Sequence, residues 1–277
     1  MSGVLYRWAG SKARILPELM AHLDKGAKYR RWVEPFLGGG SVALEAMRRE
    51  LAREYVLGDS LRPIADTWQR LQRDPAWLIA ELRQFAALPF EQQRGQFEEQ
   101  RNAPYTLCSR SARRFMILQA CNYNGMWRES KKSGYNVGFS LETKSGKRSA
   151  PHLNFEAMAE AAELLCANQV RVLCADFADT IAEASEGDLV YADPPYLGTH
   201  SSYTDKGFNI LEHQRLGRIL AHAKLCGATC WVSGSDTIDT RAIYLNWGGT
   251  AYELSARRSI GCKVASRGTK TELLIRM

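Results

Sequence analysis

Short apolar runs alternate along the chain with segments whose apolar residues recur at helical spacing. A short continuous apolar run is typical of a buried strand, and the helical spacing is typical of a helix with one buried face. Strands are predicted at 32–36, 55–59, 170–177, 188–196, 228–235, 250–254 and 271–277. Helices are predicted at 11–24, 42–53, 155–167 and 211–227. This alternation predicts an α/β fold with a doubly wound sheet.

The first predicted helix, 11–24, illustrates the pattern. Ser11 is a suitable N-cap, and Pro17 must then lie in or near the first turn, where its missing N–H costs little. The apolar face of this helix is formed by Ile15, Leu16, Leu19, Met20 and Leu23.

The segment after the second strand has a different character. Residues 61–106 are rich in Arg, Gln, Glu, Leu and Trp at helical spacing, and a basic, glycine- and serine-containing stretch follows them. Strand–helix alternation then resumes. We therefore predict an α/β domain formed by 1–60 and 146–277, interrupted by an inserted, mostly helical domain at 61–145.

The positive charge of the chain is concentrated in one place. Nine basic and two acidic residues lie between Arg110 and Arg148, which accounts for the whole net charge of +7. One interpretation is a solvated basic face. The alternation of these charges with Tyr123, Trp127 and Tyr135 favours a polyanionic partner.

The remaining composition is that of a globular protein, with 45% hydrophobic and 24% charged residues. No apolar stretch reaches the ~18 residues that a membrane span needs. The segment from Met1 to Lys12 has no apolar signal-peptide core, so we expect a cytoplasmic protein that does not bind membranes. The seven cysteines are expected to be reduced, and no cysteine–histidine spacing indicates a zinc site.

A glycine loop and an acid follow the first two predicted strands. Gly38, Gly39 and Gly40 allow the backbone to turn tightly and to approach a ligand closely. The loop lacks the lysine of a P-loop, and a simple structural turn is an equal alternative. Asp59, after the next strand, suits a ribose diol because a carboxylate accepts from two hydroxyls.

The tetrapeptide Asp193-Pro194-Pro195-Tyr196 is more specific than the glycine loop. Two prolines cannot continue a strand ladder, so the chain leaves the sheet stiffly. The Asp193 carboxylate and the Pro194 carbonyl then offer two acceptors to one NH₂ group, and Tyr196 offers a face for stacking. The tetrapeptide therefore predicts a socket for an aromatic amine, with a rigid strand exit as the alternative.

These motifs occur together in a known order. The chain resembles the Dam-type DNA adenine-N6 methyltransferases (D12 class, alpha-group motif order) over nearly its whole length. The segments that carry the resemblance are YRWAGSKARILPEL, VEPFLGGGSVALE, VLGDSL, CNYNGMWRES, ADFADTI and YADPPY. It implies a Rossmann-like methyltransferase domain with an inserted target-recognition domain, transfer of a methyl group from S-adenosylmethionine (SAM) to a flipped adenine, and no metal.

The resemblance also assigns residues. Asp193, Pro194, Pro195 and Tyr196 match the catalytic tetrapeptide. The residues expected to bind SAM are Trp8, Lys12, Glu34, Phe36, Gly38, Gly40, Asp59, Asp176, Phe177 and Asp193. Tyr203 and Phe208 are candidates to line the base pocket, with an ordinary place in the core as the alternative.

Duplex DNA is the implied partner. Arg7 matches a residue that touches DNA, and Arg128 matches one that reads guanine, since its fork fits O6 and N7. Further DNA contacts are expected from Asn122, Tyr123, Asn124, Lys131, Lys132 and Asn136. A second basic stretch comprises Arg257, Arg258, Lys263, Arg267 and Lys270. It either binds the DNA backbone or is an exposed loop. The chain departs from the family at Met126 and Trp127, so GATC is the first candidate target rather than an assigned one.

Two other functions fit parts of the pattern. One is a methyltransferase that acts on RNA. The other is a DNA-binding regulator that senses SAM without turnover, although such a sensor needs no amine socket. We expect a monomer in a bacterial or phage-infected cell, with a cognate restriction endonuclease as a further candidate partner.

Overall fold

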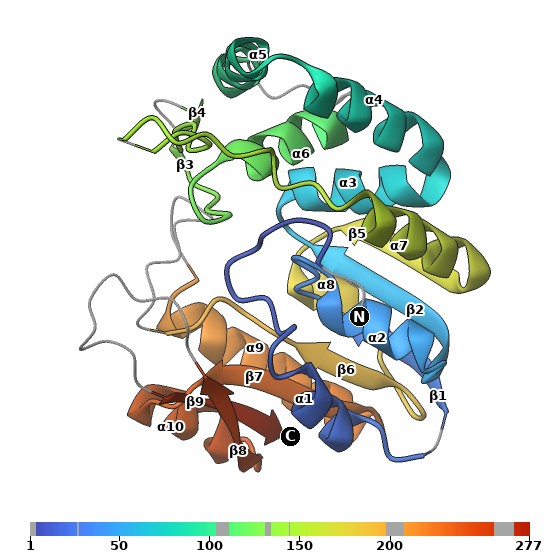
Figure 1. Cartoon of the computed structure of the whole chain (residues 1–277). Helices are drawn as coiled ribbons and strands as arrows, with labels where there is room; N and C mark the ends of the chain where they lie inside the picture. The colour runs from blue at the N-terminus through green and yellow to red at the C-terminus, as the bar shows by residue number, and fades with distance from the viewer. Residues whose placement is uncertain are drawn as a thin grey trace. The chain divides into compact units, whose positions relative to one another are not determined.

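The computed structural model describes residues 4–26, 28–103, 111–130, 134–143, 145–197, 208–257 and 269–277 (Figure 1). The chain divides into two compact units. The described residues among 1–11 and 61–167 form one, which we call the helical unit. Those among 12–60, 168–201 and 208–277 form the other, which we call the sheet unit. The helical unit extends to Ala167, whereas the insertion predicted from the sequence ends at 145.

The sheet unit is built on one seven-stranded sheet with the order β5-β2-β1-β6-β7-β9-β8. The first five strands in this order are parallel, and β9 runs antiparallel to both of its neighbours. The strands are β1 (Tyr29–Glu34), β2 (Ala52–Asp59), β5 (Gln169–Cys174), β6 (Leu189–Ala192), β7 (Thr229–Ser235), β8 (Thr250–Arg257) and β9 (Thr269–Arg276). All seven predicted strands are present, and the doubly wound, Rossmann-like α/β prediction is confirmed.

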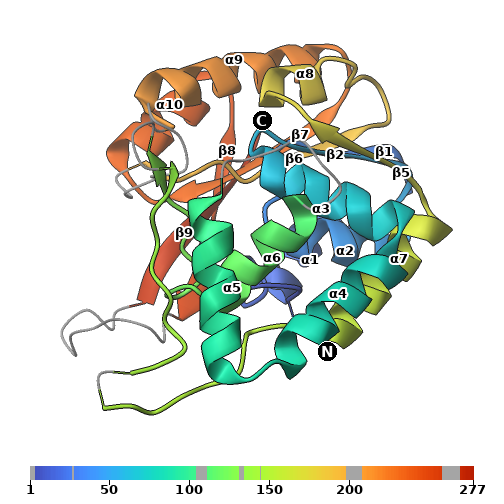
Figure 2. The ribbon, with the colours of Figure 1, turned by 90° about the horizontal axis from the view of Figure 1, so that it is seen from above.

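Helices cover both faces of this sheet. Figure 2 shows α8, α9 and α10 on one side and α1 and α2 on the other. Their bounds are α1 (Leu16–Leu23), α2 (Ser41–Arg48), α8 (Phe177–Ile181), α9 (Ile210–Leu225) and α10 (Ile238–Asn246). The α8–α10 layer and the sheet share one core cluster, in which buried Val33 and Val190 come from strands and buried Leu216 and Tyr244 come from helices.

Several predicted boundaries were wrong for physical reasons. The first helix begins at Leu16 with Ile15 as N-cap and has no side-chain cap, so Ser11 does not cap it. Pro17 lies in the first turn, as predicted. The second helix ends at Arg48 because Glu50 adopts a left-handed φ of 51° just before β2.

Two predicted strands were also too long. The strand that ends at Ala192 was predicted to reach Tyr196, but its two prolines cannot donate to a ladder. The strand before it ends at Cys174, because the Asp176 side chain accepts from the Ala178 N–H and caps α8. Helix α10 was not predicted.

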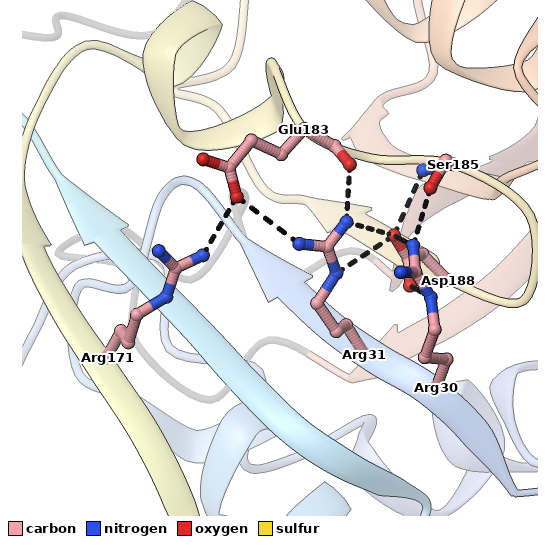
Figure 3. Close-up of polar contacts among 6 residues, drawn as sticks. All are labelled: Arg30, Arg31, Arg171, Glu183, Ser185 and Asp188. Atoms are coloured by element: carbon pink, nitrogen blue, oxygen red, sulfur yellow. Dashed lines mark hydrogen bonds and ion pairs between the residues drawn. The ribbon is translucent and has the colours of Figure 1, made fainter.

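An ion-pair network lies where the parallel strands begin. The Asp188 carboxylate is fully buried and pairs with Arg30 and Arg31, each with a closest approach of 2.8 Å (Figure 3). Glu183 pairs with Arg31 at 3.3 Å and with Arg171 at 3.1 Å. The network ties β1, β5 and the segment before β6 together at the end of the sheet opposite the strands' carboxyl ends.

The helical unit is formed by five helices and a short hairpin. Helix α6 packs against α3, α4 and α5, and α7 packs against α3 and α4. Trp127 is 1% exposed, and its ring lies 5.0 Å from Phe115 and 4.6 Å from Tyr135. The elements are α3 (Arg62–Arg73), α4 (Pro75–Ala87), α5 (Phe90–Asn102), α6 (Ser111–Cys121), α7 (Phe155–Ala167), β3 (Glu129–Ser130) and β4 (Gly134–Tyr135).

Three further findings concern the described residues alone. They include no helix with the length and apolarity required to cross a membrane. They include no cluster of three or more His, Cys, Asp or Glu side chains suited to a metal ion. Five cysteines are free thiols in this part of the chain, namely Cys121, Cys166, Cys174, Cys226 and Cys230.

Candidate active site

The strand order gathers the predicted chemical groups of the sheet unit at one edge. Strands β5, β2, β1 and β6 are parallel neighbours, so their carboxyl ends lie side by side. These ends lead into Asp176, Asp59, the glycine loop at 37–40 and Asp193, respectively. Ligands of open α/β sheets bind at this edge.

The glycine loop forms a cradle between β1 and α2. Gly38 and Gly40 have φ values of 47° and 66°, in the left-handed region that favours glycine. The Gly38 N–H donates to Asp59 Oδ2 at 2.9 Å, and the Leu37 N–H donates to the Gly58 carbonyl at 2.9 Å. The loop is therefore held against the end of β2, with its backbone turned tightly beside a carboxylate.

An aromatic cluster lies beside the cradle. The rings of Phe36 and Phe177 stack at 5.5 Å, and Phe208 packs edge-on against both, at 5.5 and 5.7 Å. The Arg215 guanidinium lies 4.5 Å from the Phe177 ring centroid and pairs with Asp176 at 2.6 Å. Flat apolar rings next to a carboxylate can hold a purine face and its polar edge. Tyr203 lies outside the described residues.

The tetrapeptide lies in a charged, largely buried cluster. Lys12, 3% exposed, places Nζ 2.7 Å from Asp193 Oδ2 and 4.8 Å from the centroid of the Tyr196 ring. The Tyr196 hydroxyl donates to Glu272 Oε2 at 3.0 Å. Burial raises the pKa of the Asp193 carboxyl, and the adjacent Lys12 ammonium opposes that rise. Lys12 thus stabilises the ionised carboxylate, which can accept hydrogen bonds.

Among the described residues, no donor reaches the other oxygen of that carboxylate. Asp193 Oδ1 is buried and has no hydrogen-bond partner among the described residues. A buried acceptor without a donor is costly, so such an atom calls for an explanation. An amino group of a substrate would supply the missing donor.

Glu34 lies at the end of β1 and is 2% exposed. Burial raises the pKa of its carboxyl to about 8, with a smaller upward contribution from Asp193. The Trp32 Nε1–H donates to Glu34 Oε2 at 3.1 Å and opposes the rise. At neutral pH Glu34 is therefore mostly protonated and adds little negative charge beside Asp193.

The predicted DNA-contacting residues belong to the helical unit and differ in exposure. Arg128 and Tyr123 are exposed, and the Arg128 Nε–H donates to Asn136 Oδ1. Asn122 is 2% exposed, and its amide donates to the Met126 carbonyl at 2.7 Å and to the Tyr135 hydroxyl at 3.1 Å. In this structure Asn122 holds the loop before Arg128 rather than presenting its amide at the surface.

Arg7 is held close to the same loop. Its carbonyl accepts from Gln119 Nε2 at 3.0 Å, and a Cβ on Gly125 would lie 2.5 Å from that carbonyl oxygen. Asn124 has a left-handed φ of 55°. Trp8, a predicted SAM contact, also belongs to the helical unit, where its ring lies 6.2 Å from Tyr6.

Several predicted DNA contacts fall outside the part of the chain that the structure describes. Lys131, Lys132, Arg258, Lys263 and Arg267 lie outside the described residues, and the side chains of Arg257 and Lys270 are not described either. Their expected DNA contacts stay predictions, as do the roles of Arg7, Asn122, Tyr123, Asn124, Arg128 and Asn136.

Sequence reasoning missed three residues of the sheet unit. Glu272 contacts Tyr196, Arg215 pairs with Asp176, and the buried His213 bonds to the Pro195 carbonyl at 3.0 Å. They lie on β9 and α9, far from the tetrapeptide in sequence. No local sequence signal singles them out, because α9 and β9 both carry several other charged or polar residues.

This geometry is that of a Rossmann-like α/β protein whose sheet carries, at its carboxyl edge, the glycine cradle and a corner formed by Asp193, Pro194, Pro195 and Tyr196. Residues 8–260 match the family model described as D12 class N6 adenine-specific DNA methyltransferase, so the chain belongs to that family. It is accordingly a DNA adenine-N6 methyltransferase.

Relatives with assigned names agree with this membership. The DNA N-6-adenine-methyltransferase of Escherichia phage P1 is 30% identical over 279 residues, which cover 98% of this chain but 35% of the phage protein. The Retron Ec67 DNA adenine methylase of Escherichia coli is 29% identical, covering 99% of this chain and 90% of that protein. The DNA adenine methylase of Vibrio cholerae is 28% identical, with 97% and 93% covered.

Proposed function

We propose that this enzyme transfers the methyl group of SAM to N6 of an adenine extruded from a short duplex DNA site, with GATC as the first candidate. The observation that carries the proposal is the buried Asp193 Oδ1, which lacks a donor among the described residues and stands at the proline-braced corner. An adenine amino group supplies that donor.

The residues of the corner then have separate tasks. Adenine N6 is a poor nucleophile because its lone pair is delocalised into the ring. Hydrogen bonds from N6–H to the Asp193 carboxylate and the Pro194 carbonyl favour a pyramidal nitrogen with an available lone pair and stabilise the charge that grows on it. Tyr196 stacks on the base and offsets part of the cost of unstacking. The Lys12 ammonium, 2.7 Å from Asp193 Oδ2, stabilises the ionised form of that carboxylate against burial, which raises its pKa.

The cradle and the aromatic cluster beside it would hold the cofactor. SAM supplies a methyl group already activated on a sulfonium. Asp59 and the glycine loop would hold its ribose and amino-acid portions, and Phe36, Phe177 and Asp176 its adenine. These contacts orient the donor toward the corner, and orientation of two reactants is a large part of the catalysis such a site can provide. This assignment needs no metal.

We assign DNA recognition to the inserted domain predicted at 61–145, within a catalytic domain formed by 1–60 and 146–277. Arg128 is exposed, and Asn136 holds its guanidinium, which supports direct readout of a guanine in the major groove. We further propose that the enzyme is a monomer, which light scattering tests, and that it is cytoplasmic, which cell fractionation tests. A restriction endonuclease encoded by a neighbouring gene is a further proposed partner.

Incubation with tritiated SAM and duplex DNA tests the proposal. Label should appear in N6-methyladenine, and Asp193→Ala should abolish labelling while DNA binding persists. Sequencing of modified adenines in DNA from a methylation-free host that expresses the protein should identify the target site. Label at cytosine would refute the proposed chemistry.

The two rival functions predict other outcomes of the same assay. A preference for RNA over duplex DNA would favour the RNA methyltransferase. Binding of SAM and DNA with no methylation of any DNA tested would favour the regulator.

A further inference from the structure

The tetrapeptide corner has few ways to be held in place. Pro194 and Pro195 have no N–H groups, so the backbone there can be fixed only through carbonyl oxygens and neighbouring side chains. The catalytic geometry needs reacting atoms placed closely, because a misplacement of about 1 Å can cost about 100-fold in rate. A donor that fixes a carbonyl of this corner therefore bears directly on catalysis.

His213 supplies such a donor. It lies in the first turn of α9 and is 1% exposed. Its Nε2 lies 3.0 Å from the Pro195 carbonyl oxygen, and its Nδ1 lies 2.8 Å from the Tyr244 hydroxyl on α10. Both ring nitrogens are thus engaged, one by the catalytic corner and one by the next helix.

The partners determine the tautomer of His213. A carbonyl oxygen can only accept, so Nε2 must carry the hydrogen. Burial lowers the pKa of His213 to about 4, so the ring is neutral at physiological pH and Nδ1 accepts from the Tyr244 hydroxyl. The hydrogen bonds therefore run in one direction, from Tyr244 to His213 to Pro195.

The same imidazole also contacts the aromatic cluster. The Phe208 ring packs edge-on against His213 with centroids 4.7 Å apart, and Phe208 contacts Phe36 and Phe177 in turn. His213 thus contacts the backbone of the tetrapeptide corner directly, and Phe208 connects it to Phe36 and Phe177, the rings assigned to the cofactor side.

We propose that His213, oriented by Tyr244, is a positioning residue that fixes the Pro195 carbonyl and thereby aims the Pro194 carbonyl and the Tyr196 ring at the target base. This role rests on the proposed function of the tetrapeptide. His213 acts through the Pro195 carbonyl, so its effect is on the rate of methyl transfer within the assembled complex.

Single-turnover methylation with enzyme in excess over a duplex substrate tests the role. His213→Leu should lower the rate constant by about 10- to 100-fold. The dissociation constants for SAM and DNA should change by less than about threefold, which separates loss of positioning from loss of binding. A purely structural role would instead lower the fraction of active enzyme and leave the rate constant of that fraction unchanged.

Two further variants sharpen the test. His213→Gln should recover most of the rate, because a glutamine amide can donate to the Pro195 carbonyl and accept from Tyr244. Tyr244→Phe keeps the buried ring but removes the donor to Nδ1, so it should also slow transfer. His222→Leu, an exposed histidine on the same helix, is the matched control.

The outcomes divide as follows. A His213→Leu rate constant within about threefold of the wild type, or equal rates for the Leu and Gln variants, overturns the positioning role. Should the Leu variant not fold, an unchanged rate for Tyr244→Phe overturns it. Full activity of Asp193→Ala refutes the proposed corner itself, whereas an inactive Asp193→Ala beside a fast His213→Leu refutes only the role of His213.

Discussion

Replacement of Glu34 by glutamine should stabilise the protein, and increasingly so as the pH rises. The carboxyl is 2% exposed, and its pKa is about 8 in the folded chain against an ordinary 4.5. The folded state therefore holds this proton more tightly than the unfolded state. As the pH rises from about 4.5 to about 8, the unfolded chain releases its proton first, and the free energy of unfolding falls; above about 8 the loss is complete.

The size of the effect follows from the two pKa values. One pKa unit corresponds to about 1.4 kcal/mol, so the full loss is at most about 5 kcal/mol, and about 3 kcal/mol is already lost at pH 7. Glutamine has nearly the same shape, and its amide oxygen can still accept from Trp32 Nε1. It cannot ionise, so Glu34→Gln should remove the pH-dependent loss.

Urea unfolding followed by circular dichroism, without SAM, measures the difference between the variant and the wild type. The free energy of unfolding of Glu34→Gln should exceed that of the wild type by less than about 1 kcal/mol at pH 5. The excess should be about 3 kcal/mol at pH 7 and between about 4 and 5 kcal/mol at pH 9. Glu54→Gln, an exposed carboxyl on the neighbouring strand β2, is the matched control. A Glu34→Gln difference that stays constant over this range would refute the reasoning that Glu34 is a buried carboxyl held neutral.

Three other substitutions test separate parts of the molecule. Arg128→Ala should cost about 1–3 kcal/mol of discrimination at one base pair in competitive methylation of substituted sites, and an unchanged preference would remove Arg128 from direct readout. Glu272→Leu should slow single-turnover methylation by about tenfold, because the Tyr196 hydroxyl loses its acceptor, whereas Glu272→Gln should retain most of the rate. Equal rates for the two variants would show that this hydrogen bond does not position Tyr196. Asp188→Ala should lower the free energy of unfolding, measured by urea denaturation, by about 3–5 kcal/mol, because it leaves buried Arg31 without its closest carboxylate. A loss below about 1 kcal/mol would show that the network in Figure 3 contributes little to stability.

Local sequence patterns were sufficient to predict most of the fold. Each of the seven strands contains a short segment rich in apolar residues, so its place in the chain is visible without tertiary information. Boundaries were less accurate where one residue overrides the run. Pro194 and Pro195 stop β6 early, and the Asp176 side chain starts α8 where the sequence alone predicts continued strand.

The candidate site divides in the same way. The residues next to strand ends, such as Asp59 and Asp193, could be predicted because the edge of a parallel sheet is a known place for ligands. Lys12, Glu272 and His213 acquire their roles through contacts between elements that are distant in the chain. The spacing of apolar residues indicates only whether a position faces the core. It does not indicate which residue of another element that position contacts.

The sequence alone determined the α/β class and the doubly wound sheet, and it predicted a socket for an aromatic amine, because each follows from short-range spacing and backbone stereochemistry. Only the tertiary structure decided that Asp193 keeps one buried oxygen without a partner while Lys12 engages the other, that Glu34 holds its proton at neutral pH, and that His213 grips the Pro195 carbonyl. The physical reason is that protonation and hydrogen-bond partnership depend on burial and on neighbours in space, which folding alone brings together.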